Sequence, residues 1–298
     1  MIAGIREYAE KDLPTLVELI NESYKHDYEF YPYNEERLRS WIGERKFRIL
    51  MAEENGKIIG SAAYHDSSWG EEIEWIAVTE SPNRKTLENA FVAELEKFVK
   101  SGKIFRPIDA ESQRINEWIE RGYRPEGGLY HMITMLDHVR TLPIIPEGIN
   151  MRSLKPDEEK EFVEAVNAGF ERERVKFGDI QLWKTESPPF GEEWIYVAEA
   201  NGRIVSVVVA KPDTYFNNFF AGNRGYLGPA ATLPEYRGKN LASALTARAM
   251  NHLLQKGMNS ASLYTSETNC ASLTLLQRIG FVVGHHWKFV RKTLPQRS

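Results

Sequence analysis

The stretch 234–243 ("PEYRGKNLAS") combines residue types that bind anions. Arg237 and Lys239 are cations on either side of Gly238, and an Ala- and Leu-rich segment follows directly. That segment predicts a helix at 238–256, whose start leaves backbone N–H groups without partners and carries a partial positive charge. Such a helix start is a site for anions, and phosphate is its usual ligand. The alternative interpretation is a basic helix start with no ligand.

Asn240 stands where a second glycine would complete the loop. Asn is the non-glycine residue that most readily adopts a left-handed backbone conformation. We therefore expect the loop to keep an anion-binding shape, although the Asn side chain adds bulk beside a bound phosphate.

The elements that position this loop occur twice along the chain. Residues 5–24 align without a gap on residues 151–170, and residues 51–60 align on residues 197–206, both at an offset of 146 (151 − 5 and 197 − 51). An unchanged offset over some fifty residues, including a shared Ala-Glu-x-Asn-Gly, predicts two copies of one fold.

Each copy shows the same succession of elements. A short strand is expected first (4–7 and 150–153), and an amphipathic helix follows it. The Asn-Gly pairs at 55–56 and 201–202 lie between apolar runs, which is typical of a β-hairpin. Strands at 73–79 and 226–233 then lead into long helices at 84–101 and 238–256. This alternation predicts an α/β fold with a mixed sheet in each copy.

We place the two domains at residues 1–138 and 148–298, because the connecting segment 137–150 is rich in Pro. Gly122 aligns on Gly280 near the end of each copy, at an offset of 158 (280 − 122). The second copy therefore holds about a dozen extra residues, which we assign to residues 214–225.

Three motifs in the second copy resemble the GNAT acyltransferase family. Arg237-x-x-Asn240-x-Ala242 resembles its Arg/Gln-x-x-Gly-x-Gly/Ala pyrophosphate loop, with Asn in place of the middle Gly. Residues 232–234 ("TLP") resemble the Val-x-Pro at the end of its fourth strand. Residues 268–281 ("TNCASLTLLQRIGF") resemble its Asn-x-x-Ala-x-x-Leu-Tyr-x-x-x-Gly-Phe segment. The resemblance is strong for about 150–292, and the repeat extends it to about 1–136.

This resemblance implies two tandem GNAT-like domains and acetyl-CoA as the cosubstrate of the second. It also implies a set of cofactor-binding residues around the pyrophosphate and the pantetheine. These are Ala231, Thr232, Leu233, Arg237, Gly238, Lys239, Asn240, Leu241, Ala242, Asn269 and Ser272. Asn269 also suits a helix N-cap, and the two roles are compatible.

In the family an amine attacks the acyl-CoA thioester directly, and a Tyr commonly protonates the leaving thiolate. Leu276 stands at that Tyr position and has no proton to donate. Tyr226 and Tyr264 are the candidate catalytic residues instead, and Tyr226 stands where many relatives carry a catalytic Glu. The alternative for both is an ordinary tyrosine of the sheet.

The first copy lacks the features of the loop. Its segment 78–91 has no Gly, has Pro82 in the turn, and carries Glu80 and Glu88. Close approach of a phosphate to the backbone needs Gly, and carboxylates repel anions. We expect no CoA binding there, and we interpret this copy as a degenerate, structural domain.

Composition excludes other classes of function. Charged residues make up 27% of the 298 residues and the net charge is −4, with no basic block, so we expect no nucleic acid partner. We expect neither a membrane segment nor a secretory signal at residues 1–13. The single Cys270 forms no internal disulfide, which favours the cytoplasm. The adjacent His285 and His286 are a poor chelate on a strand, so we expect no metal.

The acceptor is expected to be a small-molecule or peptide amine. Residues 171–194 and 215–226 are the loops that would border it, the second being either an aromatic lid or a loop buried against the other domain. The principal hypothesis is an N-acetyltransferase, either monomeric or homodimeric. The alternatives are a non-catalytic CoA-binding regulatory protein and an acyltransferase of the mycothiol-synthase type.

Overall fold

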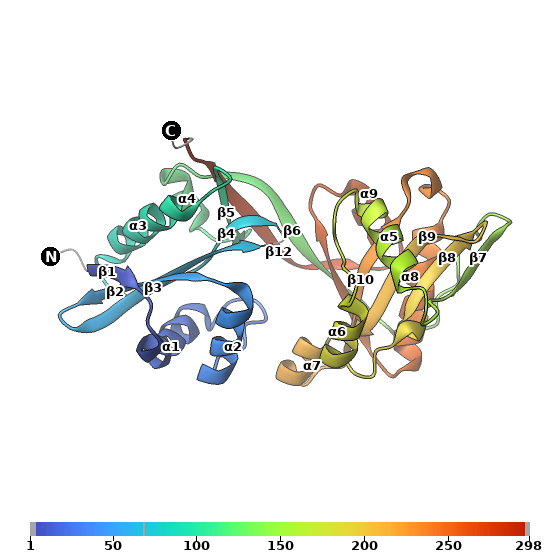
Figure 1. Cartoon of the computed structure of the whole chain (residues 1–298), viewed down its shortest axis with the longest axis horizontal. Helices are drawn as coiled ribbons and strands as arrows, with labels where there is room; N and C mark the ends of the chain where they lie inside the picture. Colours follow the sequence, from blue (N-terminus) through green and yellow to red (C-terminus); the bar gives the residue numbers. More distant parts are fainter. Residues whose placement is uncertain (1–3, 68, 296–298) are drawn as a thin grey trace. The chain divides into compact units, whose positions relative to one another are not determined.

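The computed structural model describes residues 4–67 and 69–295, and residues 1–3, 68 and 296–298 lie outside the described part. Two compact units divide the chain. Unit 1 comprises the described residues of Met1–Leu129 and His286–Ser298, and unit 2 is Tyr130–His285. The chain passes from unit 1 to unit 2 along strand β6 and returns along strand β12 (green and red in Figure 1).

Unit 1 contains an open sheet with the strand order β1-β2-β3-β4-β5-β12. Its elements are β1 (Gly4–Glu7), α1 (Leu13–Tyr24), α2 (Glu35–Arg45), β2 (Arg48–Glu54), β3 (Lys57–Ser67), β4 (Gly70–Val78), α3 (Arg84–Leu95), β5 (Lys103–Asp109), α4 (Ile115–Glu120) and the larger part of β12 (Val282–Thr293). All neighbours in this sheet are antiparallel except β4 and β5, which are parallel.

Unit 2 repeats this plan with the strand order β6-β11-β10-β9-β8-β7. Its elements are β6 (Arg124–Met135, the second half), β7 (Ile149–Ser153), α5 (Glu159–Phe170), α6 (Asp179–Glu186), β8 (Ile195–Ala200), β9 (Arg203–Pro212), α7 (Thr214–Phe220), β10 (Arg224–Thr232), α8 (Leu241–Gln255), β11 (Ser260–Ser266) and α9 (Cys270–Arg278). The strands β10 and β11 are parallel, like β4 and β5.

The two compact units are not two consecutive segments of the chain, because the last strand of each copy, β6 or β12, continues into the other unit. Residues Trp287–Thr293 of β12 pair with Lys103–Asp109 of β5 in unit 1. The end of β6 joins unit 2, where Leu136 donates its backbone N–H to Asn259. The boundaries expected from sequence (1–138 and 148–298) contain no sign of this exchange, because a strand's apolar pattern does not specify which of two similar sheets it completes.

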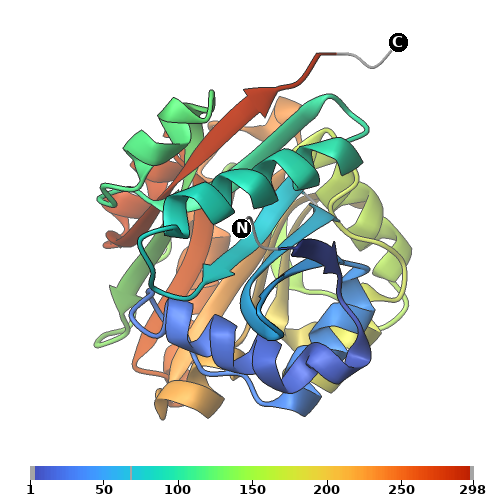
Figure 2. The same cartoon turned by 90° about the vertical axis from the view of Figure 1, so that its left-hand side faces the viewer.

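Apolar side chains cover both faces of each sheet. In unit 1, the buried residues of α1, among them Leu13, Leu16 and Ile20, pack on one face, and Phe91 and Leu95 of α3 pack on the other. Figure 2 shows α1 (blue) and α3 (teal) on opposite sides of these strands. The amphipathic pattern of the α1 segment is therefore that of a helix lying on a sheet.

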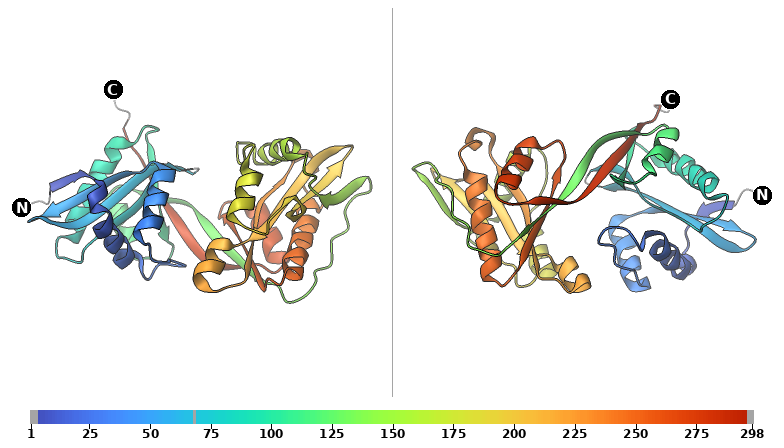
Figure 3. Two further views of the ribbon diagram at one scale, coloured as in Figure 1. Left: turned by 60° about the horizontal axis from the view of Figure 1, so that its bottom comes forward. Right: turned by 180° about the vertical axis from the view of Figure 1, so that it is seen from behind.

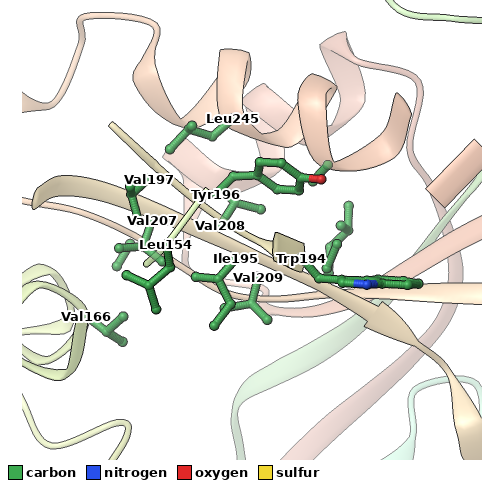
Figure 4. Packing of buried hydrophobic residues seen from close by; sticks show 14 of the residues in the cluster. Leu154, Val166, Trp194, Ile195, Tyr196, Val197, Val207, Val208, Val209 and Leu245 are labelled. Carbon is green, nitrogen blue, oxygen red and sulfur yellow. The ribbon is translucent and has the colours of Figure 1, made fainter. Parts of the chain in front are cut away.

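In unit 2, α5 and α8 lie on opposite faces of the sheet (Figure 3). Alternate residues of β8 and β9 point to the two faces, as a strand's period of two requires. Figure 4 shows Tyr196 and Val208 on the side of Leu245 from α8, and Ile195 and Val209 on the opposite side of the strands. All of these side chains are buried.

The internal repeat is visible in individual interactions. Arg6 donates hydrogen bonds to Asp12 and Glu53, and Arg152, 146 positions later, donates to Glu158 and Glu199. Both Asn-Gly pairs adopt positive φ at both residues (51° and 76° for Asn55-Gly56, 51° and 74° for Asn201-Gly202), as a tight hairpin turn requires. These contacts give Glu199 a structural role.

Of the helices described, none has both the length and the apolar character for crossing a bilayer.

The exchange of β12 predicts where its core residues matter. Val290 is fully buried in unit 1, whereas Val282 on the same strand is 65% exposed. Val290→Ala should lower the free energy of unfolding of unit 1 by about 2 kcal/mol. Val282→Ala should lower that of unit 2, which contains Val282, by less than about 0.5 kcal/mol. Hydrogen exchange at the amides of β3 and β9 measures each unit separately. Faster exchange in β9 rather than in β3 would contradict this assignment.

Candidate functional site

The strands β10 and β11 separate partway along their length. Their parallel pairing covers Arg224↔Ser260 through Tyr226↔Ser262, although β10 continues to Thr232 and β11 to Ser266. On its other side β10 pairs with β9 along most of its length, with a bulge between Leu227 and Ala230. The β10–β11 ladder therefore ends at Tyr226, and beyond it one edge of the β10 backbone has no ladder partner on β11. We call this separation of the two strands the opening.

The loop that follows β10 begins helix α8. Gly238 and Asn240 have φ values of 77° and 63°, both in the left-handed region, and residues 237–240 are exposed. Asn240 thus has the left-handed conformation that its residue type allows. It occupies the N-cap position of α8 without a side-chain capping bond. The first N–H groups of the helix, which have no partner within the helix, are therefore not capped by this side chain.

Arg237 lies at the entrance to this loop. Its guanidinium donates hydrogen bonds to the carbonyl oxygens of Thr232 (3.3 Å) and Gly169 (2.9 Å), and it pairs with the Glu171 carboxylate (3.2 Å). Its side chain is half exposed. These contacts link the end of β10, the end of α5 and the start of α8, and they hold a cation beside the exposed N-terminus of α8.

The two tyrosines expected from sequence lie together at the base of the opening. The ring centroids of Tyr226 and Tyr264 are 6.2 Å apart. Burial raises the pKa of Tyr226, and the Arg174 charge and a hydrogen bond from the backbone of Tyr264 partly offset that rise. Tyr226 therefore keeps its proton at neutral pH and can donate it. Tyr264 is 44% exposed, and its ring stacks on His131 at 4.6 Å.

The remaining residues predicted around the loop divide into exposed and buried ones. Leu233 and Leu241 are each 1% exposed and belong to the core of unit 2, so their side chains hold the loop in place. The Ala231 carbonyl accepts a hydrogen bond from Ser206, and Thr232 shares a second bond with the same hydroxyl. Lys239 extends over the ring of Tyr236, and Ala242 is half-buried in the first turn of α8.

Asn269 and Ser272 form the start of α9. The side chain of Asn269 accepts a hydrogen bond from the Ser272 backbone N–H at 3.2 Å, which is an N-cap interaction. Thr265 of β11 donates to the Ser272 hydroxyl. Leu276 is 4% exposed in the core, at the position that corresponds to Trp118 of the first copy (276 − 118 = 158). A buried apolar side chain at this place serves packing in both copies.

Sequence reasoning missed Lys211, which lies opposite Tyr226 in the β9–β10 pairing. Its ammonium is 5.3 Å from the ring centroid of Trp183 and 5.7 Å from that of Tyr226. Burial lowers the pKa of Lys211, the Glu186 and Asp213 carboxylates oppose this effect, and the Arg174 charge adds to it. The signal was present, because a single lysine follows the apolar run "IVSVVVA" within a strand that is otherwise buried.

The two loops expected to border an acceptor contain short helices. Residues 171–194 include α6, which brings Trp183 over Lys211. Residues 215–226 include most of α7, whose rings pack on one another, with Tyr215–Phe219 and Phe216–Phe220 centroids 4.8 and 5.3 Å apart. Arg224 lies over the Phe216 ring at 3.5 Å. The α6 segment therefore contributes a side chain to the surroundings of Tyr226.

The corresponding opening in unit 1 is filled by its own side chains. The strands β4 and β5 share one pair in their parallel register, Glu72↔Phe105. Beyond it, the Tyr24 hydroxyl bonds both the N–H and the carbonyl of Ile76 (2.9 and 3.1 Å). Arg106 donates to the Ile73 carbonyl and to the same Tyr24 hydroxyl. These bonds occupy the β4 backbone where the β10 backbone is exposed.

The start of α3 in unit 1 also lacks an anion cradle. Asn83, its N-cap, has a φ of −94°, outside the left-handed region. Glu88 is 2% exposed and accepts hydrogen bonds from Arg84, Arg114 and Arg121 at 2.6–2.8 Å. The carboxylate is thus the anion around which these arginines gather, rather than an unpaired repulsive charge.

The conformation of Asn240 leads to a stability test. Asn240→Val places a β-branched residue at a φ of 63°, and we expect a loss of about 1–2 kcal/mol in the free energy of unfolding, while Asn240→Gly should be neutral within about 0.5 kcal/mol. Asn150→Val, at an exposed strand position, is the control and should also be neutral. Equal denaturation midpoints for Asn240→Val and Asn240→Gly would show that the loop is not held in this conformation.

Comparison with known proteins agrees with this geometry. Residues 150–283 match the model of an acetyltransferase (GNAT) domain. The mycothiol acetyltransferase of Streptomyces griseus is 30% identical over 145 residues, which cover 47% of this chain and 45% of that protein. The mycothiol acetyltransferase of Thermobispora bispora is 28% identical over 149 residues, 47% and 48% of the two chains. The chain thus spans about half the length of the curated relatives it matches.

Solved structures extend the likeness to both units. A GCN5-related N-acetyltransferase from Sphaerobacter thermophilus has a TM-score of 0.71 at 20% identity, and the match covers 99% of this chain and 97% of that one. A tandem GNAT protein from the clavulanic acid biosynthesis pathway has a TM-score of 0.65 at 12% identity, covering 99% of each chain. At sequence identities of 20% and 12%, these likenesses support the fold of this chain and carry no information about its substrates. The chain therefore has a tandem GNAT-type fold, and its residues 150–283 match the GNAT acetyltransferase domain.

Proposed function

We propose that unit 2 is an acetyl-CoA-dependent N-acetyltransferase that acts on a primary amine, and that unit 1 binds no CoA. The observation that carries this proposal is the opening between β10 and β11, which leads to the exposed start of α8. An extended thioester with an amide-containing arm and a pyrophosphate fits an open strand edge that ends at a helix N-terminus.

Each predicted cofactor residue has a place in this proposal. The N–H groups at the start of α8, with Gly238, Asn240 and the Arg237 cation, receive the pyrophosphate. The exposed edge of β10 near Ala231 receives the pantetheine amides. Asn269 and Ser272, which cap α9, border the same arm as the motif resemblance implies. Arg237 must then exchange its contact with Glu171 for one with phosphate.

The reaction is direct attack of the neutral amine on the thioester carbonyl, followed by departure of the CoA thiolate. Lys211 is placed to accept the proton of the acceptor ammonium, because its lowered pKa increases its neutral fraction. Tyr226, which keeps its proton, is placed to protonate the thiolate, with Tyr264 beside it. In this proposal Tyr226 takes the role of the acid that Leu276 cannot provide.

The names of the curated relatives support a proposal for the acceptor class. Several relatives that match about half of this chain are named mycothiol acetyltransferase, and on this ground we propose a sugar-linked cysteine amine as acceptor rather than a peptide. The second candidate function is non-catalytic CoA binding, and it is favoured by the absence of a Tyr at Leu276. We propose the cytoplasm as the location of the reaction.

Isothermal titration with acetyl-CoA tests the cofactor site. The wild-type chain should bind one equivalent, and Arg237→Glu should lower the affinity at least tenfold, since a charge-assisted bond contributes about 1.5–3 kcal/mol. Arg203→Glu is the control, because Arg203 is another exposed arginine of unit 2 that pairs with a glutamate, and its affinity should be unchanged. Absence of binding by the wild type at millimolar acetyl-CoA would reject the proposal.

The pH profile of transfer tests the base. If neutral Lys211 accepts the proton, kcat/KM rises with pH as that amine deprotonates, below the usual lysine pKa of 10.5. Lys211→Met should lower kcat/KM by about 10²–10⁴ and remove this rising limb, with the acetyl-CoA affinity retained. Lys256→Met is the control with an unchanged profile. Thiol release from acetyl-CoA with a cysteine-linked amino sugar measures the rate, and an unaltered profile in Lys211→Met would remove the base role.

A further inference from the structure

Unit 1 holds a compact group of side chains of the types that bind metal ions. His65 is 3% exposed and Glu72 9% exposed, and Glu74 is partly buried. The His65 Nε2 atom lies 2.7 Å from a Glu74 carboxylate oxygen and 3.9 Å from a Glu72 carboxylate oxygen. One atom from each of the three residues falls within 4.8 Å of the others. An imidazole and two carboxylates thus converge on one point inside the unit.

The sheet itself produces this convergence. His65 of β3 and Glu72 of β4 are direct partners in the antiparallel ladder, so their side chains lie on the same face. The register then shifts, since Ala63 pairs with Trp75 while Tyr64 pairs with Ile73, and Glu74 is the extra residue of a bulge. A bulge re-aims a side chain, and here it turns the Glu74 carboxylate onto His65.

The internal repeat relates these positions to the candidate catalytic residues of unit 2. His65 corresponds to Lys211 (211 − 65 = 146), and Glu72 corresponds to Tyr226, because each of the last two is the final β-partner before its strand separates from the parallel neighbour. His65↔Glu72 and Lys211↔Tyr226 are the same cross-strand pair in the two units. Glu74 corresponds to Gly228 (228 − 74 = 226 − 72), so unit 1 places two carboxylates where unit 2 has none.

The neighbouring cation is the buried guanidinium of Arg106, whose charge acts on both carboxylates but which forms no ion-pair contact with either among the described residues. Among the described residues, the ion pairs of Glu72 and Glu74 are those with His65. The nearby guanidinium of Arg106 is bonded to the Ile73 carbonyl and the Tyr24 hydroxyl. One buried and one partly buried carboxylate around a single imidazole therefore offer three ligand atoms to a divalent cation, which would also compensate the negative charge of the carboxylates.

We propose that His65, Glu72 and Glu74 bind a divalent transition-metal ion, of the Zn²⁺ or Mn²⁺ kind, within unit 1. A nitrogen ligand with two carboxylate oxygens suits these ions better than Mg²⁺ or Ca²⁺, which prefer oxygen ligands alone. This replaces our expectation that the chain has no metal site, which considered the pair His285–His286. It also gives the unit without a CoA loop a ligand of its own, independently of the proposed acetyl transfer.

Metal titration of the whole chain tests the proposal. Chelator-treated protein is titrated with ZnCl₂ and, separately, MnCl₂ at pH 7.5 by calorimetry. We expect one saturable site per chain for at least one of the two ions, and at least a tenfold loss of affinity in Glu74→Gln and in His65→Ala. His138→Ala is the matched control, because His138 forms an exposed pair with Asp137 (2.6 Å) that resembles a fortuitous surface site, and its affinity should be unchanged.

Two further measurements keep the test decisive. Hydrogen exchange in β3, with acetyl-CoA binding by unit 2, shows whether each variant is folded. Anomalous diffraction at the zinc edge on wild-type crystals grown with ZnCl₂ requires no variant, and a peak bonded to His65 Nε2 is the expected result. The proposal is overturned by the absence of saturable binding of either ion, by equal affinity in folded Glu74→Gln, or by a peak elsewhere only. None of these outcomes alters the acetyl-CoA site of unit 2.

Discussion

Backbone hydrogen bonding at the point where two parallel strands separate is the constraint on which the structure depends. Buried N–H and C=O groups need partners, so a strand that leaves its neighbour must bond to something else. In both units the separation starts one residue after a cross-strand pair, Glu72↔Phe105 in unit 1 and Tyr226↔Ser262 in unit 2. The two units differ in what meets the exposed edge.

Unit 1 meets this need with its own side chains, whereas we propose that a bound ligand meets it in unit 2. Tyr24 and Arg106 bond the free edge of β4, and Glu88 gathers three arginines near the start of α3. In unit 2 the edge of β10 leads to a helix start with left-handed Gly238 and Asn240. The two units thus share one fold, and a few side chains rather than a change of fold make unit 1 closed and unit 2 open.

Local features of the fold were predictable because they depend on nearby residues. The Asn-Gly turns, the buried face of α1 and the left-handed Asn240 follow from the conformational preferences of single residues or from a helical period. The long helix expected at 84–101 ends at Leu95 and continues as a 3₁₀ turn, Glu96–Phe98. Element ends depend on tertiary contacts that a pattern does not contain.

Features that join distant residues were not predictable in this way. The exchange of β6 and β12 depends on which sheet edge each strand meets. The role of Lys211 depends on Trp183 of α6 and Tyr226 of β10 lying around it. The repeat offset of 146 does pair His65 with Lys211, yet the register and the bulge are needed to bring Glu72 and Glu74 to the same point. Sequence reasoning therefore named the loop and the two tyrosines of the candidate site, and it missed Lys211 beside them.

The central claim is that one unit is open to acetyl-CoA and the other is closed by its own side chains. Hydrogen-exchange mass spectrometry with and without acetyl-CoA tests it most directly, because it reports on backbone amides in both units at once. The account predicts slower exchange at residues 230–244 of unit 2 and unchanged exchange at residues 76–88 of unit 1. Protection at residues 76–88, or no protection at residues 230–244 at saturating acetyl-CoA, would contradict it.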